Sequence, residues 1–318
     1  MLKWTDPAWR SEAEAWIRDQ LGERDVAAGR IEHAHVRPWG TAVRVETGGG
    51  VLWFKANIAP LAYEVPLTEE IAARRPDCVP RIVAADARRG WLLLEDAGPI
   101  LAEVYPAGPP LAVWEDVLRR YAELQIDAAA RAEALVAAGV PHRGLADLIA
   151  GLRRVLANDR LVRPSADTAL SDNELEQLHS HFPTVAEAIE TFAAVELPDS
   201  VQHDDLHEWN VCVRDGDYRF IDWGDACIAQ PLLSLWVPIE HMEPDDVDAA
   251  RDAYLEPWTA LRRYNELLAA CDAALLLAQI TGVLKWELIS SALGDEERTG
   301  YEVAITGRLR RLLELTCA

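Results

Sequence analysis

The sequence contains little lysine and little methionine, and its cysteines are scattered. Among its 318 residues are two methionines, and only Lys3, Lys55 and Lys285 of the 31 basic residues are lysines. The five cysteines never form a CxxC pair, which argues against a disulfide framework or a structural zinc site. A lysine inside an apolar strand is therefore a feature that needs a specific explanation.

Long apolar runs are absent as well. No stretch approaches the roughly 18 uninterrupted apolar residues that a membrane-spanning helix needs. The first ten residues carry Trp4, Asp6 and Pro7, whereas a signal peptide has an apolar core. We therefore expect a soluble, cytoplasmic protein without a membrane partner, as a monomer or a homodimer.

Positive charge is scarce relative to negative charge. Asp and Glu number 53 against 31 Lys and Arg, which gives a net charge of −22. A phosphate-rich polymer would be repelled, so nucleic acid is a poor partner. A cationic small molecule would be attracted, although an acidic surface also serves solubility alone.

The pattern of the chain changes from strands to helices. A helix is predicted from Thr5-Asp6-Pro7 to Gly22. Strand-like runs and one helix follow, and residues 111–195 and the chain from Pro231 onward are helical. The second half has one strand-forming region, residues 200–222.

The length suits two modest domains, so we predict domains at 1–97 and 98–318. The predicted strands are 33–37, 42–46, 51–55, 81–85 and 91–95; glycines 48–50 form a turn, and the short helix covers 64–74.

One segment, residues 201–225, concentrates residue types that carry chemistry. Asp215-Gly216 is a strong two-residue hairpin signal between two short strands. Counting the register outward from that turn brings Asn210 and Asp222 side by side at the open end of the hairpin. An amide oxygen and a carboxylate placed together suit magnesium, which prefers oxygen ligands.

The residues just before this hairpin have the spacing of a catalytic loop. His203, Asp205 and Asn210 fit the protein-kinase pattern H-x-D-x-x-x-x-N. Phosphoryl transfer needs a carboxylate to accept the proton of the attacking hydroxyl. A polar turn would explain any one of these residues, but their joint spacing favours catalysis. A metallohydrolase site of His203, Asp205 and His207 is a rival, yet the sequence offers no second histidine cluster to complete it.

This segment resembles the aminoglycoside phosphotransferase and choline kinase-like family, which shares the protein-kinase-like fold. Its members typically show H-G-D-L-H-x-x-N and then I-D-W/F, and this chain has H-D-D-L-H-E-W-N at 203–210 and I-D-W at 221–223. The resemblance implies an α+β fold of two lobes, with a small β-rich N-terminal lobe and a larger, mostly helical C-terminal lobe. It also implies catalytic roles for Asp205, as the base, and His203, and magnesium binding by Asn210 and Asp222.

The resemblance extends to nucleotide-binding residues in the first third. The run V-L-W-F-K-A at 51–56 looks like the family's third strand. It implies that Lys55 binds the ATP phosphates and pairs with a helix glutamate. Glu64 best matches that glutamate, and Glu69 and Glu70 are alternatives.

Two further stretches are assigned to the nucleotide by the same resemblance. Gly40 and Thr41 occupy the place of the phosphate-covering turn, although G-x-G-x-x-G is incomplete there and an ordinary tight turn is the other interpretation. The stretch from Glu95 to Ala97 resembles the hinge, whose backbone would bind the purine of ATP or, as the alternative, of GTP. The sequence lacks G-x-x-x-x-G-K-[ST], so a P-loop enzyme is not indicated.

Two positions depart from the family pattern. The usual glycine after the motif histidine is Asp204, which adds a charge beside the base. The aspartate of a P-x-x-D-L pattern is replaced by Ser234. Because serine still forms hydrogen bonds, we predict altered anchoring of the loop and retained catalysis.

The implied function is transfer of the γ-phosphate of ATP, with Mg²⁺, to a hydroxyl of a small molecule. An aminoglycoside-like, amino-sugar, sugar or amino-alcohol acceptor fits the family. Asp225 and Glu287 are the predicted acceptor-binding residues, because carboxylates bind ammonium groups; a helix cap or a solvated helix face is the alternative for each. The alternative function is a catalytically silent, nucleotide-binding regulatory protein of the same fold.

Overall fold

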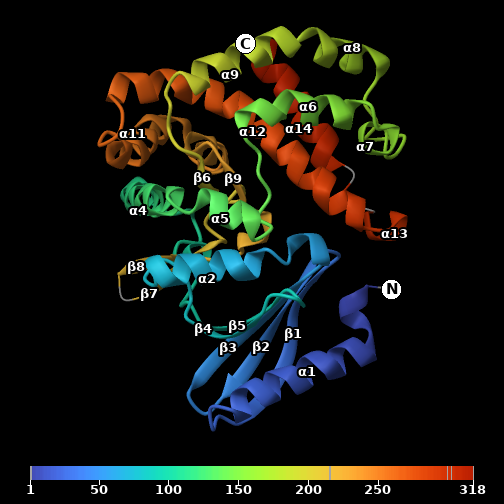
Figure 1. Ribbon diagram of the computed structural model, residues 1–318, viewed down its shortest axis with the longest axis vertical. Coiled ribbons are helices and arrows are strands. Elements are labelled where there is room, and N and C mark those ends of the chain that lie inside the picture. The colour runs from blue at the N-terminus through green and yellow to red at the C-terminus, as the bar shows by residue number, and fades with distance from the viewer. Residues whose placement is uncertain (1, 215, 299, 302, 318) are drawn as a thin grey trace. The chain divides into compact units, whose positions relative to one another are not determined.

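The structure is a computed structural model that describes every residue except 1, 215, 299, 302 and 318 (Figure 1). The chain forms two compact units. The first comprises Met1–Ile100, Val211–Gly224 and Ala292–Arg298, and the second comprises Leu101–Asn210, Asp225–Ser291 and Thr299–Ala318. The motif segment is therefore divided between the two units after Asn210.

The first unit is built on a five-stranded antiparallel sheet with the strand order β1-β2-β3-β5-β4. Helix α1 (Pro7–Gly22) precedes the sheet and α2 (Glu64–Arg74) is inserted between β3 and β4. This sheet confirms the predicted β-rich first third, and the α2 bounds are those predicted from the sequence. The strands are β1 (Ala28–Arg37), β2 (Gly40–Thr47), β3 (Gly50–Asn57), β4 (Ile82–Asp86) and β5 (Trp91–Glu95).

Helix α1 is confirmed, with its start within the predicted Thr5-Asp6-Pro7 segment and its end at Gly22. Asp6 is the N-cap, and its Oδ1 accepts a hydrogen bond of 2.9 Å from the amide of Ala8. Pro7 follows at the first helical position, where its missing N–H costs nothing. The Thr5 hydroxyl instead donates to the Leu2 carbonyl, at 2.8 Å.

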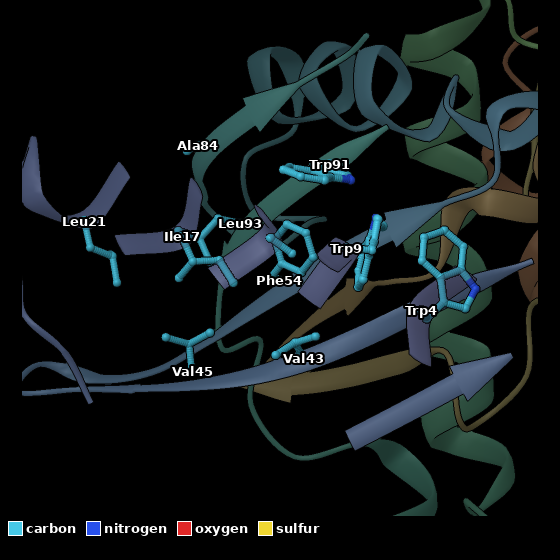
Figure 2. Packing of buried hydrophobic residues seen from close by; sticks show 12 residues of the cluster. Trp4, Trp9, Ile17, Leu21, Val43, Val45, Phe54, Ala84, Trp91 and Leu93 are labelled. Carbon is cyan, nitrogen blue, oxygen red and sulfur yellow. The ribbon is translucent and has the colours of Figure 1, made fainter. Parts of the chain in front are cut away.

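An aromatic core joins α1 to one face of the sheet (Figure 2). Trp9 of α1 and Phe54 and Trp91 of the sheet are all buried. The rings of Phe54 and Trp91 meet edge to face, with centroids 5.4 Å apart. Because side chains alternate along a strand, Lys55 faces away from this core. The core packing thereby directs the lysine to the opposite face of the sheet.

The predicted turn between β2 and β3 is confirmed, and strands β1, β2 and β3 are longer than predicted. Thr47 pairs with Gly50 across the β2–β3 hairpin, which leaves residues 48 and 49 in the turn. Strand β1 starts at Ala28, five residues before the predicted start at 33. Its first residues are mostly exposed, so they lack the apolar alternation that would reveal a strand.

The short hairpin of β7 (Val211–Arg214) and β8 (Asp217–Phe220) has the predicted register. Val211 pairs with Phe220 and Arg214 with Asp217. Gly216 adopts a φ of 84°, which suits glycine in a tight turn. Its predicted turn partner, Asp215, lies outside the described residues.

The second unit is mostly helical, as predicted, with one small antiparallel pair of strands. The strand β6 (Ser200–Gln202) pairs with β9 (Cys227–Ala229). The prediction that strands in the second half end at 222 was wrong, because β9 is too short to show a period. The helices of this unit are α3 (Leu101–Val104), α4 (Leu111–Ala129), α5 (Ala132–Ala137), α6 (Leu145–Leu156), α7 (Asp159–Val162), α8 (Asp172–Ser180), α9 (Phe182–Ala193), α10 (Trp236–Glu240), α11 (Val247–Trp258), α12 (Tyr264–Ala292) and α14 (Val303–Cys317), while α13 (Asp295–Arg298) belongs to the first unit.

Helix α12 is the longest element, with 29 residues. By length and composition alone it could cross a membrane, although polar residues interrupt its apolar run. Of its most apolar 18-residue window, 67% is buried within the protein, as in the core helix of a globular fold. Lys285 lies inside this buried helix.

Candidate functional site

In the first unit, Lys55 is bound by two carboxylates. Its Nζ lies 2.6 Å from Glu64 Oε1 of α2 and donates a second hydrogen bond to Asp222 Oδ1. Burial alone would lower the pKa of Lys55, but the charges of Asp222 and Glu64 outweigh it and raise the pKa above its ordinary value. The ammonium group is therefore charged and fixed in position.

Glu64 is the glutamate that pairs with this lysine, rather than Glu69 or Glu70. Its side chain is 4% exposed, and its second oxygen accepts a hydrogen bond from the Asn57 amide. Burial raises the pKa of Glu64, and the positive charge of Lys55 opposes that rise. A carboxylate buried this deeply depends on its cation.

Asp222 follows strand β8 with a φ of 65°, a left-handed conformation that aspartate tolerates better than most residues. Its side chain is 56% exposed, so its carboxylate is open to solvent. Asn210, its predicted partner in metal binding, belongs to the second unit. The placement of one ligand beside the other stays a prediction from the hairpin register.

Gly40 and Thr41 lie at the start of β2, directly after the turn at residues 38 and 39. A Cβ on Gly40 would come within 2.5 Å of Asn57 Oδ1, so a larger residue here would displace the Asn57 side chain. The Thr41 hydroxyl donates a 2.7 Å hydrogen bond to the His35 carbonyl. The start of β2 therefore packs against the Asn57 side chain, which in turn donates a hydrogen bond to Glu64.

The predicted hinge is held by side chains at both ends. The Glu95 carboxylate binds Arg81, and that hydrogen bond lowers the pKa of Glu95. Asp96 accepts hydrogen bonds from Trp53 Nε1 at 3.0 Å and from the Gly98 amide at 2.9 Å. Ala97, between these anchors, is buried.

In the second unit, the catalytic loop orients Asp205. Asn210 Nδ2 donates to the Asp205 carbonyl at 2.8 Å and to Asp205 Oδ2 at 3.1 Å. His207 Nε2 lies 3.3 Å from the same Oδ2. Because the amide nitrogen of Asn210 makes both of these hydrogen bonds, its amide oxygen is not used in them. The Asp205 side chain is 35% exposed and thus accessible to a substrate.

Asp205 is ionised over the whole physiological range. Burial would raise its pKa, but Lys285 and the hydrogen bond from His207 lower it well below its ordinary value. A carboxylate with a low pKa is a weak base in the ground state. It is suited to orient a hydroxyl and to accept the proton late in the reaction.

The loop is anchored by a buried polar network around Tyr121 of α4. The His203 amide donates to the Tyr121 hydroxyl at 2.8 Å, and this hydroxyl lies 3.3 Å from Ser234 Oγ. Gln125 Nε2 donates to Ser234 Oγ at 2.9 Å and to the Val201 carbonyl at 2.7 Å. Anchoring therefore passes through α4, in place of a direct aspartate contact. The His203 side chain is fully buried.

Two basic residues beside the loop were missed by the sequence analysis. Arg143 Nη1 lies 3.4 Å from Asp204 Oδ2, and Lys285 Nζ lies 3.0 Å from Asp225 Oδ2. Both basic side chains are buried. The signal for Lys285 was in the sequence, because it is the lone lysine of a long apolar helix; nothing in the sequence marks Arg143.

The two predicted acceptor-binding carboxylates are both paired with basic residues of their own unit. Asp225 contacts Lys285, and Glu287 of α12 forms a bidentate pair with Arg154 of α6 at 2.7 and 2.6 Å. Among the described residues, no group of three His, Cys, Asp or Glu is arranged to hold a metal ion. The geometry therefore gives no support to the rival metallohydrolase site.

Solved structures similar to this chain include kinases and phosphotransferases of small molecules. The GDP and kanamycin complex of the aminoglycoside phosphotransferase APH(2")-IIIa matches at a TM-score of 0.61 and 15% identity, over 96% of this chain and 98% of that one. The macrolide 2'-phosphotransferase MphH of Brachybacterium faecium matches at 0.60 and 16%, over 93% and 98%. A choline/ethanolamine kinase family protein of Mesorhizobium loti matches at 0.58 and 16%, over 90% and 88%. At such identities the likeness establishes the kinase-like two-lobe fold alone.

The family itself is identified by sequence. No curated protein matches the chain. The family model described as "Phosphotransferase enzyme family" matches residues 55–267, which begin at Lys55 and include the catalytic loop and the Asp222 hairpin. This match confirms the resemblance, and the protein, a small-molecule phosphotransferase, belongs to the phosphotransferase enzyme family.

Proposed function

We propose that the protein transfers the γ-phosphate of ATP to a hydroxyl of a small cationic or polyhydroxylated acceptor. The observation that carries this proposal most strongly is the binding of Lys55 by both Glu64 and Asp222. In kinases of this fold the lysine between these two acids holds the nucleotide phosphates. GTP is the alternative donor, and the relative in complex with GDP and kanamycin supports a guanine nucleotide as a serious competitor.

The proposed roles follow from the chemistry of each group. Lys55 orients the nucleotide phosphates, and Glu64 keeps the ammonium group in place. Asp222 and Asn210 supply the carboxylate and amide oxygens that magnesium prefers, and the ion would neutralise phosphate charge. The Glu95–Ala97 stretch supplies backbone groups for the purine, and Gly40 and Thr41 form the turn beside the phosphates.

On the acceptor side, Asp205 hydrogen-bonds the attacking hydroxyl and receives its proton. His203 supports the loop through its backbone bond to Tyr121. Most of the rate enhancement would come from positioning and from charge neutralisation. We keep Asp225 and Glu287 as proposed contacts of a cationic acceptor, which would compete with Lys285 and Arg154 for these two carboxylates.

The acceptor class follows from charge and from the relatives. A net charge of −22 favours a cation. The similar structures include a kanamycin complex and a choline/ethanolamine kinase family protein. Aminoglycosides, amino sugars, sugars and amino alcohols are therefore the compounds to screen.

The test is ADP release from ATP and Mg²⁺ across a panel of these compounds. Asp205→Asn should lower kcat by about 10²–10⁴-fold while nucleotide binding persists, because it removes the proton acceptor and keeps the shape. Asp167→Asn, a change in an exposed loop, serves as the matched control. Turnover near the wild-type rate in Asp205→Asn would show that Asp205 is not the base. Nucleotide binding without transfer or hydrolysis would favour the silent regulatory protein.

A further inference from the structure

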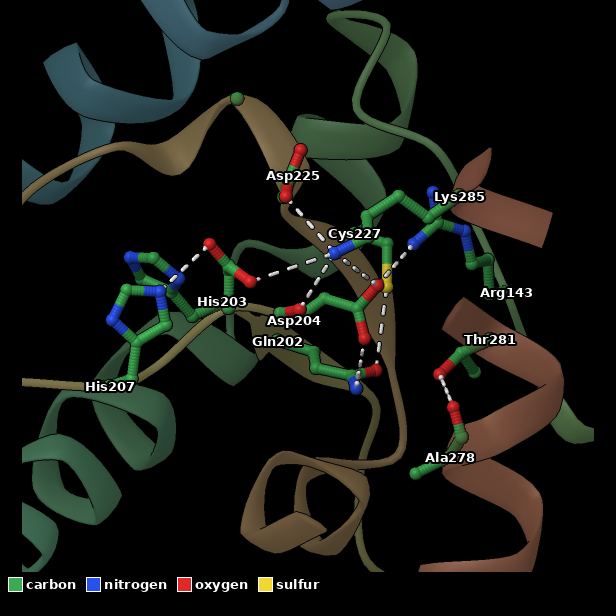
Figure 3. A network of polar contacts seen from close by, with 12 residues as sticks. Arg143, Gln202, His203, Asp204, His207, Asp225, Cys227, Ala278, Thr281 and Lys285 are labelled. Carbon is green, nitrogen blue, oxygen red and sulfur yellow. Dashed lines mark hydrogen bonds and ion pairs between the residues drawn. The ribbon is translucent and has the colours of Figure 1, made fainter. Parts of the chain in front are cut away.

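Lys285 of α12 is a buried cation next to the predicted catalytic loop, and three carboxylates surround it (Figure 3). Its Nζ donates to the Asp204 carbonyl at 3.0 Å and to Asp225 Oδ2 at 3.0 Å. It also lies 3.8 Å from Asp204 Oδ2 and 3.9 Å from Asp205 Oδ1. The Lys285 ammonium group thus lies close to the backbone of the loop at Asp204, to the proposed base Asp205 and to Asp225 in the segment after the hairpin.

The burial of this lysine requires a specific compensation. Its side chain is 3% exposed, and an unpaired ammonium group at such a position would cost several kcal/mol. Burial alone would lower the pKa of Lys285, but Asp225, Asp204 and Asp205 outweigh it and raise the pKa. The cation is therefore retained by the carboxylates around it, and its effect on them is reciprocal.

The buried carboxylate of Asp204 has a second basic residue, Arg143, beside it in addition to Lys285. It has a φ of 60°, the left-handed region where glycine is favoured, and its carboxylate is fully buried. Arg143 lies 3.4 Å from one oxygen, and Gln202 Nε2 donates to the other at 3.2 Å. Arg143 and Gln202 thus form the hydrogen bonds to the Asp204 carboxylate, whereas Lys285 approaches the Asp204 and Asp205 carboxylates at ion-pair distances of 3.8 and 3.9 Å.

The two oxygens of Asp205 have different partners. Oδ2 accepts from Asn210 at 3.1 Å and lies 3.3 Å from His207. Oδ1 lies on the side of Lys285, at 3.9 Å. The carboxylate therefore has its hydrogen-bond partners on one oxygen and a buried positive charge at ion-pair distance from the other.

We propose that Lys285 is a positioning residue for phosphoryl transfer, which holds the Asp205 carboxylate in the orientation that receives the hydroxyl proton. The inference rests on the proposed function of Asp205. With 3% of its side chain exposed, Lys285 does not reach the acceptor and acts through Asp205. Its second task, neutralising the buried Asp204, is structural and separable by mutation.

Three variants separate the two tasks. Lys285→Met removes both. Lys285→Arg keeps the charge. Asp204→Gly combined with Lys285→Met removes the extra carboxylate together with the cation and restores the residue that the left-handed backbone prefers. Lys3→Met, at an exposed lysine, is the control for loss of one positive charge.

For Lys285→Met we expect kcat to fall by about 100-fold, with the KM for ATP within about twofold, because misplacement of the base slows the chemical step without affecting nucleotide binding. The kcat of Lys285→Arg should be at least about tenfold higher than that of Lys285→Met. In the double variant the melting temperature should return toward the wild-type value while kcat stays low. If kcat of the double variant is within about twofold of wild type, Lys285 only neutralises Asp204 and the proposal is overturned. If Lys285→Met does not fold, the double variant decides alone.

A structural measurement keeps this test independent of the acceptor. If the wild type transfers phosphate to no compound and hydrolyses no ATP, the proposed function fails. Crystal structures of the wild type and the double variant then decide the inference. An Asp205 carboxylate that has rotated away from Asn210 and His207 supports positioning by Lys285, and an unchanged carboxylate refutes it.

Discussion

Replacement of Lys55 by methionine should destabilise the first unit by about 3 kcal/mol at pH 7, because it leaves a buried carboxylate without its cation. Glu64, the carboxylate concerned, is 4% exposed and pairs with Nζ at 2.6 Å. The other partner, Asp222, is 56% exposed, and ion pairs with solvent-exposed groups contribute about 0–1 kcal/mol. Nearly all of the loss therefore comes from Glu64.

Protonation of Glu64 sets an upper limit to this loss and gives it a pH dependence. Keeping a carboxyl protonated at pH 7, against an ordinary pKa near 4.3, costs roughly 3.7 kcal/mol. Burial raises the pKa of Glu64, and Lys55 is the group that opposes the rise. In the variant, the folded state therefore binds a proton that the unfolded state releases above about pH 4.3. The deficit should shrink by about 1.4 kcal/mol per pH unit between pH 7 and pH 5.

Equilibrium urea unfolding, followed by circular dichroism at pH 7 and pH 5, measures this effect. Lys55→Met combined with Glu64→Gln should recover about 2 kcal/mol, because the neutral amide still accepts the hydrogen bond from Asn57. Lys3→Met, at an exposed position, should stay within about 0.5 kcal/mol of wild type. A deficit that is equal at both pH values, or a double variant less stable than Lys55→Met, would refute the reasoning.

Two further predictions concern the second unit. Tyr121→Phe removes the hydroxyl that accepts a hydrogen bond from the His203 amide, so it should lower the free energy of unfolding by about 1–3 kcal/mol. It should also lower kcat while the KM for ATP changes less. An unchanged kcat would contradict loop anchoring by Tyr121. Glu174 has its pKa lowered to about 2 by Arg310 and by the Ser171 backbone of the α8 capping box. Its contribution should therefore be complete above about pH 4.3 and be lost as the pH falls through about 2. Glu174→Gln should thus cost about 1 kcal/mol at pH 7 and almost nothing near pH 2 in thermal unfolding, and a loss independent of pH would contradict this account.

Local patterns in the sequence were sufficient for the sheet and the motif hairpin. The alternation of V-L-W-F-K-A predicted β3 and the face that carries Lys55, because a strand has a side-chain period of two. The turn signal fixed the β7–β8 register, since pairing propagates residue by residue from a tight turn. Strand β9 and the start of β1 were not predicted, because the one is three residues long and the other is largely exposed.

Contacts distant in sequence were decided by the tertiary structure. The sequence by itself determined the family, and it predicted the catalytic loop and the role of Lys55, because these depend on spacing within short segments. Only the structure selected Glu64 among three glutamates and brought Arg143 and Lys285 to Asp204, from positions 61 and 81 residues away. Burial explains the difference: a charge in the interior must find a partner wherever the packing of helices provides one, and no local period records that choice.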